Sequence, residues 1–372
     1  MIYETIERNE KAVNAIKKAL KKADTLYLAT DPDREGEAIS WHLYELLKEK
    51  GCLENKEVHR VAFYEVTKSA VQDAIKNPRE LSSNLIDAQH ARRALDYLVG
   101  FNLSPLLWKK IQKGLSAGRV QSPALRMIVE RERDIEDFKA REYWTVESDL
   151  EFNDSDFLGR LTEFNNEKIK KFSIEDAKQA STIKSALEDA STSELLIKTV
   201  TKKQRKRQPT APFITSTLQQ EAIRKLGFTA QWTMRVAQQL YEGIDVGDGT
   251  IGLITYMRTD SVNLAKEALI EIRSFITSRY GEKSLPEEPR VFKTKSKNAQ
   301  EAHEAVRPTS VARVPNEIKD SLTDEQFRLY ELIWKRTMAS QMTHATIDSV
   351  AVDISCGEGN IFRANGSSIA DP

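Results

Sequence analysis

A cluster of acidic residues directly after a short apolar stretch constrains the fold of this chain most strongly. Thr25-Leu26-Tyr27-Leu28-Ala29-Thr30 predicts a short buried strand, and the acidic turn Asp31-Pro32-Asp33-Arg34-Glu35-Gly36-Glu37 follows it at once. Around this pair the sequence predicts helices and one more strand, at about 5–22, 38–50, 59–63 and 67–76. Helices that alternate with strands in this way predict a parallel sheet covered by helices, so this part of the chain belongs to the α/β class.

The acidic turn is a candidate metal site. Asp31, Asp33 and Glu35 lie at the carboxyl end of the predicted strand, where open α/β sheets bind their ligands. Carboxylates this close repel one another, and a divalent cation with oxygen ligands, Mg²⁺ above all, relieves that repulsion. Gly36 lets the backbone approach a ligand closely. The alternative is a solvated acidic turn in which Glu37 only favours the dipole of the following helix.

A tyrosine turn is the candidate catalytic centre. Ile254-Thr255-Tyr256-Met257-Arg258-Thr259-Asp260-Ser261 lies between a strand predicted at 251–257 and a helix that Asn263 is expected to cap, and a helix amino terminus attracts phosphate. Arg258 lies close enough in sequence to share a phosphate oxygen with the Tyr256 phenol. A guanidinium in this place favours the phenolate and stabilises charge on a phosphorus under attack. The alternative is an ordinary buried tyrosine with a polar tip.

One histidine lies in the segment Gln300-Glu301-Ala302-His303-Glu304-Ala305-Val306-Arg307-Pro308-Thr309. With Arg307 beside it, His303 is a candidate phosphate contact, although a structural hydrogen bond is the commoner role of a single histidine. The segment is not a zinc motif, because no second histidine lies four residues away.

A basic and aromatic region, predicted to be helical from about 82 to 140, is a candidate nucleic-acid surface. Cations that alternate with rings such as Phe101 and Trp108 suit a single strand, because cations contact phosphates and rings stack on bases. Gly114 and Gly118 let backbone amides approach a phosphate ahead of a helix that Ser122-Pro123 opens. The alternative is a helix bundle with ordinary surface charges. A second basic run, at 202–207, is interpreted as a solvated linker.

The rest of the chain is predicted to contain a strand-rich part and a second helical part. Strands are predicted at 143–152, 157–164, 194–203 and 344–355, and helices at 174–190, 216–226, 229–242, 263–280 and 324–341. Pro209 and Pro212 mark a joint between the strand-rich part and the second helical part. The final residues are rich in Gly and Ser and predict no closing element, which indicates a truncated fragment.

Composition excludes several classes of protein. The 372 residues predict two or three domains at about 150 residues each. Lys and Arg number 56, as do Asp and Glu, so a uniformly basic coat for nucleic acid is excluded and binding must use local patches. Two cysteines exclude a disulfide framework and a four-thiolate zinc site, and they indicate a reducing, cytoplasmic setting. We expect no membrane span, because no apolar run approaches about 20 residues.

Taken together, four motifs resemble those of the type IA DNA topoisomerases, most closely the bacterial topoisomerase I branch. They are the acidic turn, the segment Ser116-Ala117-Gly118-Arg119-Val120-Gln121-Ser122, the tyrosine turn and His303-Glu304-Ala305-Val306-Arg307-Pro308, in this order across nearly the whole chain. Met257 favours that branch, since the topoisomerase III branch more often has proline there.

The resemblance implies a multidomain fold that combines α/β and helical parts of the type IA toroid. A partial Toprim metal-binding domain would occupy 1–78, and part of a helical single-strand DNA-binding domain would occupy 79–140. A strand-rich bridging domain would begin at 141–212 and return, truncated, at 344–372. A helical domain with the nucleophilic tyrosine would occupy 213–343.

The resemblance also implies an activity and its residues. Tyr256 would attack one strand of negatively supercoiled DNA and become joined to the 5′ phosphate, and strand passage and religation would follow without ATP. Consistently, the sequence has no Gly-x-x-x-x-Gly-Lys-Ser/Thr loop. Arg258 and His303 would be catalytic, and the Mg²⁺ ligands would be Asp31 and Asp33 with help from Glu35. DNA contacts would come from Arg34, Arg92, Arg93, Asp96, Phe101, Trp108, Ser116, Ala117, Gly118, Arg119, Val120, Gln121 and Arg258. The enzyme would be a cytoplasmic, nucleoid-associated monomer.

The chain departs from the family at a few points. Tyr97 stands where the family commonly has arginine, and the family's first Toprim strand, with a Val-Glu-Ser-Pro element and a nearby lysine, precedes this sequence. We therefore expect these 372 residues alone to relax DNA poorly or not at all. The alternatives are another Toprim enzyme, such as a nuclease or primase, and a noncatalytic fragment that binds single-stranded DNA.

Overall fold

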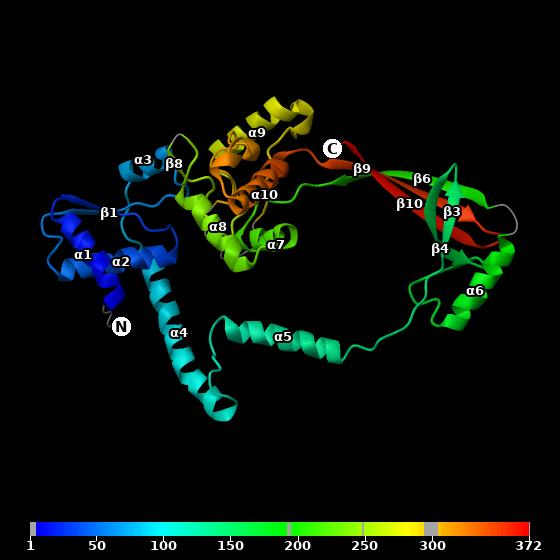
Figure 1. Cartoon of the computed structure of the whole chain (residues 1–372), viewed down its shortest axis with the longest axis horizontal. Coiled ribbons are helices and arrows are strands. Elements are labelled where there is room, and N and C mark those ends of the chain that lie inside the picture. Colours follow the sequence, from blue (N-terminus) through cyan, green and yellow to red (C-terminus); the bar gives the residue numbers. More distant parts are fainter. Residues whose placement is uncertain (1–4, 192–194, 248, 294–303, 372) are drawn as a thin grey trace. The chain divides into compact units, whose positions relative to one another are not determined.

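The computed structural model of the chain describes residues 5–191, 195–247, 249–293 and 304–371 (Figure 1). The chain forms two compact units. Unit 1 contains residues 1–127 and 210–342, and unit 2 contains residues 128–209 and 343–372. The chain passes into unit 2 within helix α5 (Gln121–Glu136) and re-enters unit 1 just after Pro209, at the predicted joint.

The first part of unit 1 has the predicted α/β order. Helices α1 (Glu7–Leu20), α2 (Arg34–Glu49) and α3 (Lys68–Lys76) alternate with strands β1 (Thr25–Leu28) and β2 (Glu57–Arg60). The two strands pair in parallel, with Thr25 opposite Glu57, so the prediction of a parallel sheet is confirmed. Helix α2 begins four residues earlier than predicted, because the side chain of Asp33 caps it by accepting a hydrogen bond from the Gly36 amide at 2.8 Å.

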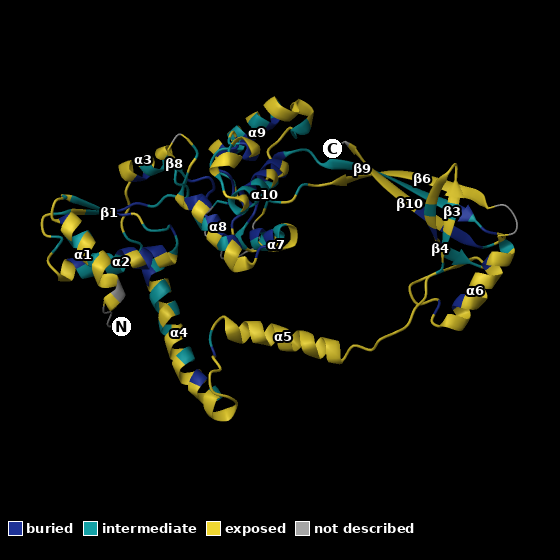
Figure 2. Ribbon diagram, in the orientation of Figure 1, coloured by how far each residue is buried: buried dark blue, intermediate teal, exposed yellow. Residues whose placement is uncertain are grey.

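The region predicted to be helical from 82 to 140 is interrupted. Helix α4 (Ser83–Lys110) ends before a ten-residue connection, and α5 begins only at Gln121. Gly114 lies in this connection with φ +89°, a conformation that favours glycine. The distal half of α4 and the whole of α5 expose most of their side chains (Figure 2). Within the described part of the chain, no helix combines the length and the apolar character needed to cross a membrane.

The second part of unit 1 is mainly helical and contains the larger apolar core. Its helices are α7 (Thr215–Leu226), α8 (Ala230–Glu242), α9 (Lys266–Tyr280) and α10 (Asp324–Gln341). Short 3₁₀ turns also occur, at Glu282–Ser284, Pro315–Glu317 and Lys319–Ser321. The core packs side chains from all four helices with the tyrosine turn, among them Leu218, Leu240, Tyr256, Ile272 and Tyr330.

Two local predictions in this part are wrong. The strand expected at 251–257 is reduced to β8 (Thr250–Ile251), which pairs with β7 (Ile244–Asp245). The backbone of the following residues forms hydrogen bonds with the loop between β2 and α3 instead of with a strand. The Gly252 amide donates to the Val66 carbonyl and the Tyr256 amide to the Tyr64 carbonyl, each at 2.8 Å. Helix α9 is capped at Ala265, not at Asn263, and the Ala265 amide donates to the Glu304 carboxylate. A carboxylate therefore occupies the helix terminus that the sequence assigned to phosphate.

Unit 2 is an antiparallel sheet with one helix. Strands β3 (Glu147–Phe152), β4 (Ser155–Phe164), β10 (Ile361–Asp371), β9 (Ala345–Ser355) and β6 (Leu196–Arg207) follow one another in space in that order. The short β5 (Glu167–Lys168) pairs with β4, and helix α6 (Ala177–Ala190) contributes Leu187 to the core beside Leu161, Ile354 and Phe362.

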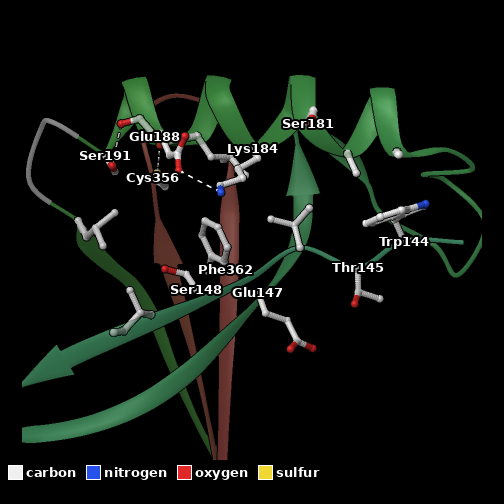
Figure 3. Close-up of a pocket in the computed structure, with 16 residues that line it drawn as sticks. Trp144, Thr145, Glu147, Ser148, Ser181, Lys184, Glu188, Ser191, Cys356 and Phe362 are labelled. Atoms are coloured by element: carbon white, nitrogen blue, oxygen red, sulfur yellow. Dashed lines mark hydrogen bonds and ion pairs between the residues drawn. The ribbon is translucent and has the colours of Figure 1, made fainter.

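Unit 2 corrects two expectations. The basic run 202–207 is not a linker, because it forms the second half of β6 and pairs with residues 345–350 of β9. The chain end also has regular structure, because residues 361–371 form β10 between β9 and β4. Pairing with β9 stabilises this strand, although its Gly- and Ser-rich composition does not favour one. A cavity of about 490 Å³ lies beside α6 and is lined by residues that include Trp144, Lys184 and Phe362 (Figure 3). None of the predicted site residues lines it.

Candidate active site

The acidic turn is tightly wound at the amino end of α2. Asp33 caps the helix through its Oδ1 atom, which leaves Oδ2 for another partner. Gly36 is required here for packing, because a Cβ at this position would lie 2.1 Å from the Asp31 carbonyl oxygen. The close approach that glycine permits is therefore between two parts of the turn itself and not, as expected, between the backbone and a ligand.

Tyr256 reaches the acidic turn across 223 residues of sequence. Its phenol donates a hydrogen bond to Oδ2 of Asp33 at 2.7 Å, and its ring packs edge-on against Tyr241 with centroids 5.2 Å apart. The side chain is buried, with 2% of the residue surface exposed. Burial and the hydrogen bond to the Asp33 carboxylate raise the pKa of Tyr256 well above its usual range. The nearby Arg258 guanidinium acts in the opposite direction and lowers the pKa of Tyr256, as expected of a cation, but its effect is smaller than that of burial and Asp33.

Arg258 extends toward the same carboxylates from the surface. Its Nη1 atom lies 3.3 Å from Oε2 of Glu35 and 3.7 Å from Oδ2 of Asp33. Half of the side chain is exposed, so the guanidinium remains accessible to a ligand. The Tyr256 phenol and the Arg258 guanidinium thus converge on one carboxylate oxygen, Oδ2 of Asp33.

Asp31 is the other aspartate of the acidic turn. Burial and the neighbouring Asp33 carboxylate raise the pKa of Asp31, and the more distant Glu242 acts in the same direction. In the described residues no three groups of the Asp, Glu, His or Cys type are placed to hold a metal ion together. Glu35 instead faces Arg258, so the turn presents a pair of repelling aspartates and not the predicted three-carboxylate cluster.

A cavity of about 710 Å³ opens beside the site within unit 1. Four segments line it: the acidic turn with Asp33, Arg34 and Glu35, helix α4, the start of α7 and the tyrosine turn. Helix α4 contributes Arg92, and the tyrosine turn contributes Arg258. Three guanidinium groups and three carboxylates, the third that of Asp260, therefore border one space, which suits a phosphate chain that approaches together with a cation.

Helix α4 and the connection after it carry the predicted single-strand contacts. Arg119 forms a bidentate ion pair with Asp96, with N···O distances of 3.0 and 3.1 Å. The ring centroids of Tyr97 and Phe101 lie 4.6 Å apart, and both side chains are exposed. The departure from the family pattern at Tyr97 therefore adds a second aromatic ring. Trp108 is half-exposed and donates its indole N–H to the Leu115 carbonyl at 2.6 Å.

The segment 116–121 is braced by its own side chains. The Ala117 amide donates to the Ser104 hydroxyl of α4 at 3.2 Å, and Gln121 donates to the Ser116 hydroxyl at 2.7 Å. The Gly118 amide donates to the Ser122 hydroxyl at 3.1 Å. That amide is therefore occupied, contrary to the expectation that it is open to a phosphate. Arg93 and Val120 lie on the exposed surface of this region.

The histidine segment is only partly described. His303 lies outside the described residues, so its predicted role stays a prediction. The Arg307 guanidinium binds two carboxylates of the protein itself. It is buried, and its Nη2 atom donates to Glu304 at 2.7 Å and to Glu65 at 3.0 Å.

Sequence reasoning missed one group of site residues entirely. The carboxylate of Glu37, interpreted as solvated, is fully buried between the guanidinium groups of Arg60 and Arg79. No local pattern distinguishes Glu37 from the exposed acids around it, because its partners come from β2 and from the loop before α4.

Comparison with known proteins identifies the family. The model of the DNA topoisomerase family matches residues 80–372, and the model of the Toprim domain matches residues 3–66. The chain belongs to the type IA DNA topoisomerase family. It is 56% identical over 370 residues to DNA topoisomerase 1 of Xylella fastidiosa strain Temecula1, covering 99% of this chain and 45% of that protein. The corresponding Rickettsia bellii protein is 53% identical over 373 residues, covering 100% of this chain and 46% of that protein.

A solved topoisomerase structure supports the fold assignment. Full-length topoisomerase I from Thermotoga maritima superposes with a TM-score of 0.77 at 36% identity, covering 98% of this chain and 57% of that one. The predicted mixed fold of a type IA topoisomerase is therefore confirmed. This topoisomerase chain spans about half the length of the curated relatives it matches. Its Toprim part, which contains the acidic turn, is a metal-binding domain.

Proposed function

We propose that this chain carries the strand-cleaving site of an ATP-independent enzyme that relaxes negatively supercoiled DNA through a transient break in one strand. One observation carries the proposal: the Tyr256 phenol and the Arg258 guanidinium meet at a single anionic oxygen, Oδ2 of Asp33, beside a cavity that α4 also lines. An anionic oxygen of a phosphodiester has the same charge and hydrogen-bonding capacity. The same two side chains are therefore suited to receive the scissile phosphate.

The chemistry follows from the partners of Tyr256. The phenol oxygen attacks phosphorus, a new phosphorus–tyrosyl bond forms at the 5′ phosphate, and the bond to the 3′ oxygen breaks. The leaving 3′ oxygen takes a proton from water and becomes a 3′ hydroxyl. Oδ2 of Asp33 already accepts the phenol hydrogen bond, so it is placed to accept the proton as the oxygen becomes nucleophilic. Arg258 then stabilises the charge that develops on the phosphate oxygens. Attack by the retained 3′ hydroxyl reverses these steps and restores the strand after passage. We propose His303 as a further contact to the scissile strand.

We propose Mg²⁺ as the metal, held by Asp31 and Asp33, with Glu35 assisting when Arg258 turns to DNA. The residues fit such an ion, because Asp31 is half-buried beside a second carboxylate that raises its pKa. Mg²⁺ typically binds through one or two protein carboxylates and substrate phosphates, so a full protein cage is unnecessary. When bound, the ion would stabilise negative charge on the phosphate.

Asp31→Asn tests this assignment without any measurement of activity. The substitution removes the repulsion between the two aspartates, so we expect the metal-free protein to melt at a slightly higher temperature. It also removes a ligand, so the stabilisation by Mg²⁺ should disappear, whereas the parent should gain about 2.7 kcal/mol at a hundred times its Kd. Thermal unfolding with and without Mg²⁺ measures both effects. Equal stabilisation of parent and variant would contradict the assignment.

We propose that single-stranded DNA lies along α4 and the segment 116–121. Exposed rings at Phe101 and Trp108 would stack on bases, and Arg92, Arg93 and Arg119 would contact the strand. Asp96 already orients the Arg119 guanidinium and would fix its direction toward DNA. Arg34, which lines the cavity, would contact the strand near the break. The backbone of residues 116–121 would support the strand in a braced conformation.

Phe101→Ala should weaken binding of a single-stranded oligonucleotide by about 1–3 kcal/mol, the usual contribution of one stacked base. The melting temperature should stay unchanged, because 69% of the residue surface is exposed. Ile270→Ala, on α9 and equally exposed at 70%, is the matched control and should not change binding. Fluorescence anisotropy at several salt concentrations measures the affinities. Equal loss in both variants would argue against stacking at Phe101.

Trapping of a denaturation-resistant protein–oligonucleotide complex tests the proposed function directly. We expect mass spectrometry of the digested complex to place the 5′-linked nucleotide on Tyr256. Cleavage without a linked residue would indicate a Toprim nuclease, and salt-sensitive binding without cleavage would indicate a noncatalytic binding fragment. We further propose the domain division at 78, 140, 212 and 343 described above, a monomeric state and a cytoplasmic, nucleoid-associated location.

A further inference from the structure

Glu37 lies one helical turn beyond Asp33 on α2 and is saturated with hydrogen-bond donors. Its Oε1 atom accepts from Nη1 of Arg79 and from the Ser82 amide, each at 2.7 Å. Its Oε2 atom accepts from Nε of Arg60 at 2.9 Å and from Nη2 of Arg79 at 2.7 Å. Burial alone would raise the pKa of Glu37, but these donors outweigh it and lower the pKa to about 2. The carboxylate is therefore charged throughout the physiological pH range.

On one side, Glu37 neutralises the cation that holds the acidic turn. The Arg60 side chain is fully buried, and its guanidinium donates to the carbonyls of Leu28 at 3.0 Å and Thr30 at 2.9 Å. Its Nη2 atom donates to the Asp31 carbonyl at 2.8 Å. A buried guanidinium without a counter-ion is strongly unfavourable, so the geometry of the turn depends on Glu37.

On the other side, Glu37 holds the beginning of α4. Ser82 is the N-cap residue of α4, and its own side chain makes no capping hydrogen bond. The Glu37 carboxylate binds the Ser82 amide instead, as a capping-box glutamate would from within the helix. Arg79 strengthens the joint, because its backbone also pairs with that of Arg60 at 2.8 and 3.1 Å.

One short stretch of α2 therefore touches both the nucleophile and the DNA-binding helix. Four residues, or about 6 Å of helical rise, separate Asp33 from Glu37. We propose that Glu37 is a positioning residue that keeps α4 in register with the acidic turn, so that a strand bound along α4 presents its phosphodiester to Tyr256. This inference rests on the proposed function, but the coupling between the helices can be measured without it.

The first test measures the distance between α2 and α4 in solution. Spin labels at Lys48→Cys and Asn102→Cys, both exposed positions, would be introduced in a Cys52→Ser, Cys356→Ala background. We expect pulsed electron resonance to give a narrow distance distribution in this parent and a broader one after Glu37→Gln. Glu271→Gln is the control, since Glu271 is a half-buried acceptor for Ser310 and Val311 far from the joint. It should keep the narrow distribution.

The second test separates binding from chemistry on a single-stranded oligonucleotide. Glu37→Gln should leave the Kd within about twofold, while the rate of covalent adduct formation at saturation falls on the order of 100-fold, the cost of a misplacement of about 1 Å. A purely structural role would lower the melting temperature without this split. Arg79→Gln is a second variant in case Glu37→Gln does not fold, because it removes two donors and keeps the Arg60–Glu37 pair.

The outcomes separate the two proposals. An unchanged distance distribution in folded Glu37→Gln or Arg79→Gln overturns the positioning role, whatever the adduct yield. A broader distribution together with adduct loss at saturation supports it. If the parent forms no adduct at all, the proposed function fails, and the distance measurement alone decides whether Glu37 couples the two helices.

Discussion

Tyr256→Phe is expected to abolish covalent attachment to DNA, by a factor of at least about 10⁴, while the chain stays folded and binds single-stranded DNA as before. The loss is this large because the phenol oxygen is the proposed nucleophile, and loss of a nucleophile typically removes most of the catalytic rate. The substitution removes one hydroxyl, whose hydrogen bond to the Asp33 carboxylate contributes about 1.5–3 kcal/mol to folding, a fraction of the usual stability of a domain. Gel analysis of denatured protein–oligonucleotide mixtures measures the adduct.

Tyr241→Phe is the matched control for this variant. Tyr241 is also buried, and its ring packs against that of Tyr256. Its hydroxyl donates only a long hydrogen bond, 3.4 Å, to the Phe63 carbonyl. We therefore expect it to retain the adduct. Retained strand cleavage by Tyr256→Phe would show that water or another side chain is the nucleophile, and the interpretation as a topoisomerase would be lost.

The α/β beginning of the chain could be predicted because its signals are local. Two short apolar strands are visible in consecutive residues, and each formed where expected to within a few positions. The wrong predictions depended on distant partners. Residues 202–207 and 361–371 carry no strong strand pattern, yet both become strands because β9 offers a free edge on each side.

The site shows the same division between local and distant information. The motifs around Asp33, Tyr256 and Arg258 could be singled out from the sequence. That Tyr256 and Arg258 both approach one oxygen of Asp33 could not, because this contact joins segments 223 residues apart and depends on the tertiary structure. The burial of two charged residues with structural ion-pair partners was not predicted. Glu37 and Arg307 look like surface charges in sequence, and only the fold shows that each is buried among opposite charges.

Arg307→Met is expected to lower the free energy of unfolding of unit 1 by about 3–5 kcal/mol. The guanidinium is 7% exposed and lies between the carboxylates of Glu304 and Glu65, so its removal leaves two poorly hydrated negative charges without a counter-ion. Hydrogen exchange of the α10 amides reports the stability of unit 1 separately from unit 2. Arg224→Met is the control. Its side chain is exposed, and its partner Glu221 keeps ion pairs with Lys225 and Arg336, so its removal should cost less than about 1 kcal/mol.

A triple variant decides whether charge or packing causes that loss. Glu65→Gln and Glu304→Gln, combined with Arg307→Met, remove the cation and both anions together, and a glutamine at 304 still offers an oxygen to the Ala265 amide. If uncompensated charge dominates, the triple variant should be more stable than Arg307→Met alone, because replacing a whole buried ion cluster is often nearly neutral. If both variants lose the same stability, the loss comes from the packing and the Pro308 carbonyl contact of the Arg307 side chain. The stability order of two variants therefore separates the two causes.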